Sequence, residues 1–412
     1  MARRGVAFLG ALLAAAAAAE VPVEQPGRVE TLGPPAPHWL LVSDIMLGRS
    51  ALVDLDSGAF LGMLSTGYNA LTAVAPRRGE TLYVPETFYS RGSRGERSDV
   101  VTVYDARQLA PVAEIAIPAK RAINVLATAN AAITDDDRFV LVFNMTPATS
   151  VSVVDTHTRS FASEVPLPGC SLVFAAGARR FFSVCADGSL LVVILDDAGQ
   201  PTTTGRSRRF FDPETDPLTE KAVRAGDEWL FVSFEGIVHP VDVAGGEIRF
   251  GETWSLFTEA DLRESWRIGG TQHLAVHPGK ERLYSLVHQG GADTHHDPGD
   301  ELWVYDLSRR ERVQRIALVH PGFDFLGESL AFGEDWVWPF DGLYELLLSL
   351  LPADITNVLV TRDDAPLLVT GSQIGGSVAV FDAVSGEFLR RVASGNLTVQ
   401  RLDAPWDGGG SR

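Results

Sequence analysis

The sequence predicts an all-β protein, a seven-bladed β-propeller built from four-stranded antiparallel blades. Three observations support this fold class. A short apolar strand that ends in Asp recurs seven times, a second apolar strand precedes most copies by 15–25 residues, and the first five copies lie 41–50 residues apart. Repeats of this length that each form a small sheet are typical of propellers. Two stacked β-sandwiches are the alternative, but a sandwich requires no repeat.

The repeated motif consists of three to five β-forming residues, an Asp and a turn that often contains Gly. The seven copies end at Asp56, Asp105, Asp155, Asp196, Asp242, Asp306 and Asp382. Because an Asp carboxylate can accept backbone N–H groups two residues further on, we expect each Asp to start the turn that follows it. Several segments after the turns alternate or partly alternate between apolar and polar residues, which predicts outer strands with one solvated face.

The last two spacings, of 64 and 76 residues, indicate insertions. The first insertion, around 250–266, has a helical pattern over 258–264. The second, at about 323–353, is unusually apolar for a propeller loop, so we expect it either to fold back over its own blade or to present a contact surface for another chain. No Gly-rich linker divides the repeats, and residues 20–412 are therefore expected to form one domain.

The N-terminus has the pattern of a signal peptide over residues 1–19. Arg3 and Arg4 precede an apolar stretch over 6–18, small residues follow, and Glu20 ends the pattern. The apolar stretch is shorter than the about 20 residues that a membrane-spanning helix needs. We expect cleavage near Ala19 and an exported, soluble, periplasmic product, with a buried Ala-rich helix as the alternative.

Composition excludes several classes of partner and site. The formal net charge of −18 argues against nucleic acid or an anionic membrane as a partner, because the phosphates would be repelled. The chain has only two cysteines, and they lack the spacing of a zinc or redox site. One bridge or two free thiols remain possible, and an exported chain permits the bridge.

A search for catalytic chemistry finds no HExxH, GxSxG, GxGxxG or P-loop pattern. The residues with metal-ligating chemistry are His273, His277, His288, His295 and His296, together with Asp293 and Asp297. We interpret them as a polar loop cluster, because adjacent histidines on a strand point to opposite faces, with a metal site as the alternative. The carboxylate runs at 135–137 and 363–364 are expected to be solvated turns. No catalytic residue and no metal site is predicted in this chain.

Several segments nonetheless resemble a known family. They are 61–67, 85–105, 168–170 with 181–190, and 294–306. The most specific is the Ser-Arg-Gly-x-Arg-Gly-Glu-Arg motif at 90–97. In these stretches the sequence is similar to the heavy subunit of the quinoprotein amine dehydrogenases, the family of methylamine dehydrogenase and aromatic amine dehydrogenase.

The resemblance implies a division of labour between two chains. The heavy chain would be a propeller in an α2β2 tetramer, and a small, cysteine-rich light chain would carry the cofactor tryptophan tryptophylquinone. The complex would oxidise primary amines to aldehyde and ammonia and pass electrons to a periplasmic blue copper protein such as amicyanin or azurin. Catalytic residues and cofactor would then belong to the light chain, and none to this chain.

The resemblance carries over to three residues. Cys170 and Cys185 match a heavy-chain disulfide, whose closure would contribute about 3 kcal/mol. Tyr68 matches a Phe that lines the substrate channel, and its hydroxyl would make the entrance more polar. The Tyr68-Asn69-Ala70 segment and the 323–353 insert both depart from the family pattern. The alternative function is a stand-alone secreted propeller used for binding or assembly, without catalysis.

Overall fold

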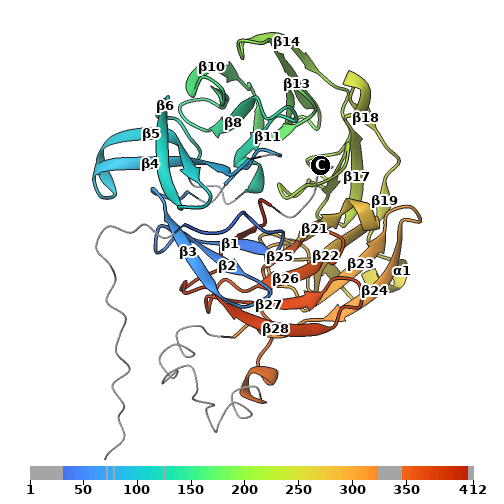
Figure 1. The fold of residues 1–412 in the computed structure, drawn as a ribbon. Coiled ribbons are helices and arrows are strands. Elements are labelled where there is room, and N and C mark those ends of the chain that lie inside the picture. The colour runs from blue at the N-terminus through green and yellow to red at the C-terminus, as the bar shows by residue number, and fades with distance from the viewer. Residues whose placement is uncertain (1–30, 71–72, 78, 124–126, 323–345, 407–412) are drawn as a thin grey trace, which may run out of the picture. The chain divides into compact units, whose positions relative to one another are not determined.

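The computed structural model describes residues 31–70, 73–77, 79–123, 127–322 and 346–406. The predicted signal peptide and most of the 323–353 insert therefore lie outside the described residues. The chain divides after Thr31, and the unit that begins at Leu32 is a seven-bladed β-propeller of antiparallel sheets (Figure 1). The predicted fold class is confirmed.

The strands follow one another blade by blade. Blade one contains β1 (Trp39–Asp44), β2 (Arg49–Asp54) and β3 (Phe60–Ser65), and blade two contains β4 (Thr81–Arg91), β5 (Arg94–Asp105) and β6 (Ala110–Ile117). Blade three contains β7 (Ala131–Ile133), β8 (Phe139–Asn144), β9 (Ser150–Asp155) and β10 (Ser160–Pro166). Blade four contains β11 (Cys170–Ala175), β12 (Arg180–Cys185), β13 (Leu190–Leu195) and β14 (Pro201–Arg206). Blade five contains β15 (Val223–Ala225), β16 (Glu228–Val232), β17 (Ile237–Asp242), β18 (Arg249–Phe250) and β19 (Trp254–Ser255). Blade six contains β20 (Trp266–Ile268), β21 (Leu274–His277), β22 (Arg282–Gln289), β23 (Glu301–Asp306) and β24 (Glu311–Ala317). Blade seven contains β25 (Asn357–Val360), β26 (Leu367–Gly371), β27 (Ser377–Asp382) and β28 (Phe388–Ala393). A last strand, β29 (Arg401–Asp403), completes blade one.

The ring is closed by strands from the two ends of the unit. β29 pairs with β1 in the register Leu41 with Asp403 and Ser43 with Arg401, so the last strand is the innermost strand of the first blade. In blade two, a single bridge between Val74 and Tyr83 occupies the innermost position. In blade six, β20 and β21 both pair with β22 and divide the inner edge between them.

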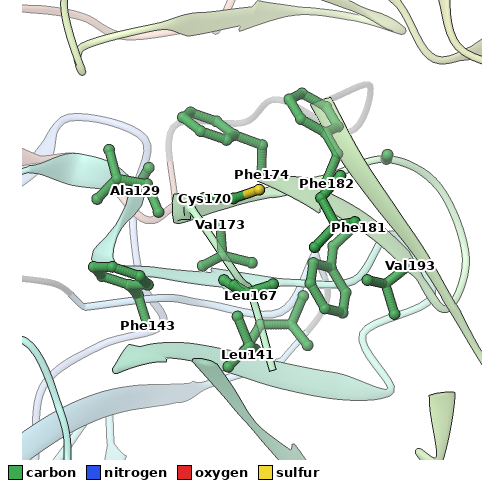
Figure 2. Close-up of a cluster of buried hydrophobic side chains, with 14 of the residues drawn as sticks. Ala129, Leu141, Phe143, Leu167, Cys170, Val173, Phe174, Phe181, Phe182 and Val193 are labelled. Carbon is green, nitrogen blue, oxygen red and sulfur yellow. The ribbon is translucent and has the colours of Figure 1, made fainter. Parts of the chain in front are cut away.

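The core lies between the faces of neighbouring blades. The second and third strands of most blades are almost wholly buried, which agrees with their continuous apolar sequence. Figure 2 shows one such cluster, to which β8 contributes Leu141 and Phe143 and β12 contributes Phe181 and Phe182. In the same cluster, Cys170 and the residue paired with it across the sheet, Cys185, form a disulfide.

The Asp motif performs the role predicted for it. With Asp54 in place of Asp56, six of the seven turn aspartates accept a hydrogen bond from the backbone N–H two residues further on, as in Asp105 with Arg107 at 2.9 Å. In the seventh, Asp306 accepts from the amide three residues on, that of Arg309, at 3.0 Å.

The first copy of the motif requires a correction. Its turn residue is Asp54, not Asp56, because β2 ends at Asp54 and its carboxylate receives the Asp56 amide. Asp56 instead points outward, where it pairs with the His38 imidazole at 2.8 Å.

The first insertion contains the predicted helix. α1 (Glu259–Arg263) begins at Thr258, whose hydroxyl accepts from the Asp261 amide, while the Asp261 carboxylate accepts from the Thr258 amide. This reciprocal pair is a capping box. Short 3₁₀ turns also occur at Thr128–Asn130, Ala244–Gly246 and Pro278–Lys280. Of the second insertion the structure describes only 346–353, where 346–349 are helical. Among the described residues, the helices are too short to cross a membrane.

Asp306 gives the turn motif a measurable pH dependence. The Ser308 hydroxyl and the Arg309 amide, followed by the Arg282 charge, lower the pKa of Asp306 from 3.8 to about 2. A carboxyl whose pKa is depressed by folding contributes stability above its unfolded pKa and loses it as the pH falls toward the folded value. We expect Asp306→Asn to be less stable than wild type at pH 7, and the difference to shrink between about pH 4 and pH 2.

Urea unfolding at several pH values measures this difference. Asp364→Asn, which changes an exposed aspartate in another turn, is the control. A stability difference for Asp306→Asn that does not change with pH would contradict the assignment.

Candidate functional site

The connections of the propeller lie on two opposite faces, because neighbouring strands of each blade are antiparallel. One face carries the turns that follow the seven motif aspartates, and we call it the Asp-turn face. The other carries the link over 66–70, which follows β3, and the hairpin over 45–48; we call it the Tyr68 face. The candidate site lies on the Tyr68 face.

Tyr68 lies on the surface of this face. Its side chain is 44% exposed, and its ring meets the Tyr89 ring edge to face, with 5.8 Å between centroids. Phe88, the neighbour of Tyr89, is also exposed. Tyr68 is therefore one of three aromatic side chains gathered where the link crosses blade two.

Two strands of blade two extend this surface. β4 and β5 have 11 and 12 residues, whereas no described strand of the other blades has more than eight, and their pairing continues to Arg91 with Arg94. Figure 1 shows this hairpin projecting from the ring. The most specific family-like motif, at 90–97, forms its tip.

A buried carboxylate supports the link from one side. Glu86 is completely buried in β4, and its Oε1 accepts from the Gly67 amide at 2.9 Å. The hydroxyl of Thr102 donates to Oε2, and the Tyr104 hydroxyl lies 3.2 Å from Oε1. Burial raises the pKa of Glu86, against the opposing effect of these hydrogen bonds.

A buried guanidinium supports the link from the other side. Arg121 is buried, and its Nη2 and Nη1 donate to the carbonyls of Tyr68 and Asn69 at 2.8 and 3.3 Å. Its Nε donates to Thr87 Oγ1 at 3.0 Å. Burial lowers the pKa of Arg121 to about 10, while the charge of Asp99 raises it in part.

Asp99 connects Thr87, Arg97 and Arg121. Its carboxylate accepts from the Thr87 hydroxyl and the Arg121 amide, both at 2.8 Å, and receives two hydrogen bonds from the Arg97 guanidinium, also at 2.8 Å. The Arg97 guanidinium also donates to the carbonyl of Arg121 at 2.7 Å. Thr87, Asp99, Arg97 and Arg121 are therefore joined in one hydrogen-bonded network, whereas the Glu86 carboxylate is satisfied separately by Gly67, Thr102 and Tyr104.

The link is held at successive backbone groups. The amides of Thr66, Gly67 and Tyr68 donate to Gly48, Glu86 and Thr87, respectively. Asn69 has a left-handed backbone with φ of 48°, and its side chain donates to the Ile123 carbonyl at 2.8 Å. The buried side chains therefore bond to the link at the Gly67 amide and at the carbonyls of Tyr68 and Asn69, which fixes the backbone that carries the Tyr68 ring.

Exposed apolar side chains gather on the same face. We call them the apolar patch: Met46, Leu47, Tyr68, Phe88, Ile374 and Leu397. Asp44 holds two of these residues near each other, because its carboxylate accepts hydrogen bonds from the amides of Met46 and Leu397 at 2.8 and 2.9 Å. In the described turns of the Asp-turn face, the one strongly exposed large apolar side chain is Val384.

A central cavity of about 280 Å³ lies between the inner strands. Asp135 lines it and receives hydrogen bonds from Arg224 at 2.6 and 2.7 Å. Burial favours a raised pKa for Asp135, but Arg224 and Arg77 hold its pKa below the usual value. The expectation that Asp135 is a solvated turn residue is therefore wrong: an ion pair with a distant strand covers it.

The candidate metal-ligating histidines have separate contacts. His273 is buried against the Thr219 hydroxyl, His277 contacts the Asp363 carbonyl, and His288 contacts Thr294. His295 stacks on Phe234 with 3.7 Å between centroids, and His296 lies beside it. Within the part of the chain that the structure describes, no three His, Cys, Asp or Glu side chains are arranged to hold a metal ion.

The fold and the site together define a β-propeller that carries an exposed aromatic link, anchored by buried polar side chains, on one of its faces. The family model described as methylamine dehydrogenase heavy chain matches residues 44–326, and the chain belongs to this family. Methylamine dehydrogenase heavy chains of Methylophilus methylotrophus and Methylobacillus flagellatus are 26% and 28% identical to it. Each alignment covers 82% of this chain, and 76% and 77% of the relatives, respectively.

Solved structures agree on the fold alone. A functionally unknown protein from Desulfotomaculum acetoxidans has a TM-score of 0.54 at 12% identity, over 88% of this chain and 98% of that one. The dihydro-heme d1 dehydrogenase NirN has a TM-score of 0.51 at 19% identity, over 90% of this chain and 75% of that one.

The substitution Gly67→Ala tests how tightly the link is packed. A Cβ at this position would lie 2.7 Å from the Thr87 carbonyl oxygen and 3.1 Å from the Phe88 ring. We therefore expect Gly67→Ala to lower the free energy of unfolding by about 1–3 kcal/mol. Gly205→Ala, where a Cβ would meet nothing within 4 Å, is the matched control and should not destabilise. Equal unfolding free energies for the two variants would show that the link is loosely held.

Proposed function

We propose that this chain is the heavy subunit of a periplasmic amine dehydrogenase with α2β2 composition. Membership of the methylamine dehydrogenase heavy chain family supports the proposal. The complex would oxidise primary amines to aldehyde and ammonia, with electrons passing to a blue copper protein such as amicyanin or azurin. Within it, this chain would carry the light chain and shape the entrance for the amine.

The observation that carries the proposal is the apolar patch on the Tyr68 face. Exposed apolar side chains that gather on one face of a protein typically mark an interaction site. The charges directly beneath the link, Glu86, Asp99 and Arg121, are buried and already bonded, so a partner would meet a mainly apolar and aromatic surface. We assign this face to the light chain.

The described tryptophans of this chain do not fit the cofactor. Tryptophan tryptophylquinone forms from two tryptophans and, when bound, accepts the electrons of the amine. The described pair with the closest rings, Trp266 and Trp303, lies 5.0 Å apart, but both side chains are buried, with Arg312 and Arg315 over the Trp303 ring. A buried pair cannot meet an amine, and this supports a cofactor in the partner.

Tyr68 would then form part of the wall through which the amine passes. Its exposed ring supplies an apolar surface, and its hydroxyl supplies a polar edge. The tyrosine in place of the family's Phe would favour amines with a polar group. The ordered link would keep the entrance in one shape as the substrate arrives.

Export is part of the proposal. The signal-peptide pattern over 1–19 would direct the chain to the periplasm, with cleavage near Ala19. The Cys170–Cys185 disulfide is consistent with that oxidising compartment.

Co-expression tests the proposed function. With a cysteine-rich light chain and the proteins that mature it, we expect a complex that reduces a redox dye when methylamine or 2-phenylethylamine is added. The isolated heavy chain should show no such activity. A monomer that captures no light chain, in the native host or after co-expression, would instead favour a stand-alone binding or assembly propeller.

Two matched variants test the assigned face. Ile374 on the Tyr68 face and Val384 on the Asp-turn face are 63% and 65% exposed. We expect Ile374→Asp to weaken light-chain binding by at least about tenfold, because it places a charge within an apolar interface. Val384→Asp should bind as wild type does, and both variants should keep wild-type stability. If Val384→Asp weakens binding and Ile374→Asp does not, the light chain binds the other face.

A further inference from the structure

We propose that Arg121 is a positioning residue that sets amine selectivity through Tyr68, a role that rests on the function proposed above. Arg121 does not reach the surface. Its effect on the Tyr68 ring is indirect, because its guanidinium holds the backbone of the link that carries this ring.

The hydrogen bonds of Arg121 are directed at the link. Three of its side-chain contacts, at 2.8, 3.3 and 3.0 Å, go to the Tyr68 carbonyl, the Asn69 carbonyl and the Thr87 hydroxyl. The neighbouring carboxylate, Asp99, receives its guanidinium hydrogen bonds from Arg97 instead. A buried cation is costly unless its donors are satisfied, and here two backbone carbonyls of the link satisfy them.

The same contacts determine where the Tyr68 ring lies. The Tyr68 amide donates to the Thr87 carbonyl, and the Tyr68 carbonyl accepts from Arg121, so both backbone groups of this residue are fixed. The ring then rests against Tyr89, which belongs to the same strand as Thr87. Asn69, in a left-handed conformation that non-glycine residues rarely adopt, is held by its carbonyl and its side chain.

Loss of these donors would leave the link free to move while the blade remained intact. Lysine keeps the positive charge but presents a single ammonium in place of a planar fork. Arg121→Lys therefore changes the geometry of the donors without changing the formal charge of the network. The Tyr68 ring would no longer be confined to one position at the entrance.

A second buried arginine provides a matched control. Arg180, at the start of β12, donates Nε to the Ala176 carbonyl at 2.5 Å and Nη2 to the Val243 carbonyl. Burial lowers its pKa, as it does for Arg121. Arg180 lies toward the Asp-turn face, so Arg180→Lys should carry a comparable structural cost without affecting the link.

The experiment is a double-mutant cycle on the assembled complex. We would measure kcat and KM for methylamine and 2-phenylethylamine in wild type, Arg121→Lys, Tyr68→Ala, the double variant and Arg180→Lys. We expect Arg121→Lys to change the ratio of the two kcat/KM values by at least about fivefold, in the direction of Tyr68→Ala, with kcat for methylamine almost unchanged. The double variant should have the ratio of Tyr68→Ala alone, because Arg121 acts through Tyr68. Arg180→Lys should keep the wild-type ratio.

Other outcomes decide against the proposal in distinguishable ways. An active wild-type complex whose Arg121→Lys variant keeps the wild-type ratio, or whose double variant shows additive changes, overturns the role of Arg121. If Arg121→Lys does not fold, Thr87→Val replaces it in the cycle and must shift the ratio in the same direction, because it removes the hydroxyl that accepts from Arg121 Nε. A correctly assembled wild-type complex that oxidises neither amine overturns the proposed function itself.

Discussion

The pairing of β29 with β1 is the interaction on which the rest of the propeller depends. Each blade buries its two faces against its two neighbours, so an open ring would expose one apolar face at each end. The two strands that close the ring come from opposite ends of the propeller unit and share one short antiparallel ladder. Asp44, at the end of β1, adds contacts to the amides of Leu397 and Thr398, so side-chain and backbone hydrogen bonds close the ring together.

The candidate site uses a different physical principle. Its surface is apolar and aromatic, whereas the layer immediately beneath it is charged and hydrogen-bonded. Although the formal net charge of the protein is −18, the half-buried Arg97 and the buried Arg121 lie beneath this link, beside the buried carboxyl groups of Asp99 and Glu86. Because hydrogen bonds are directional, they restrict the link to one backbone conformation more strictly than apolar contacts would. The exposed Tyr68 ring on the link is therefore held in a defined position.

The regular parts of this fold could be predicted from the sequence because they depend on local patterns. The Asp motif identifies all seven blades, since each carboxylate bonds within its own turn, and the capping box of α1 is equally local. The spacing of the motif does not distinguish Asp54 from Asp56 as the turn residue of the first copy, because both positions fit it. The pairing of Asp135 with Arg224, and of Arg121 with the Tyr68 carbonyl, joins residues 89 and 53 positions apart. Such pairs leave no periodic signal. The available hint was the position of Glu86 and Thr87, which directly follow the apolar run over 82–85 within one strand.

The disulfide has a consequence for assembly. Its two cysteines are the only ones in the sequence and belong to adjacent strands of one hairpin, 15 residues apart. The chain therefore has a single possible intrachain pairing and, once oxidised, no thiol with which to attack another protein. Both cysteines are also buried, so the thiolates of a proposed cysteine-rich partner would have poor access to the bond during disulfide exchange. The partner's own cysteines could then find their pairs without forming mixed disulfides with the subunit that carries them.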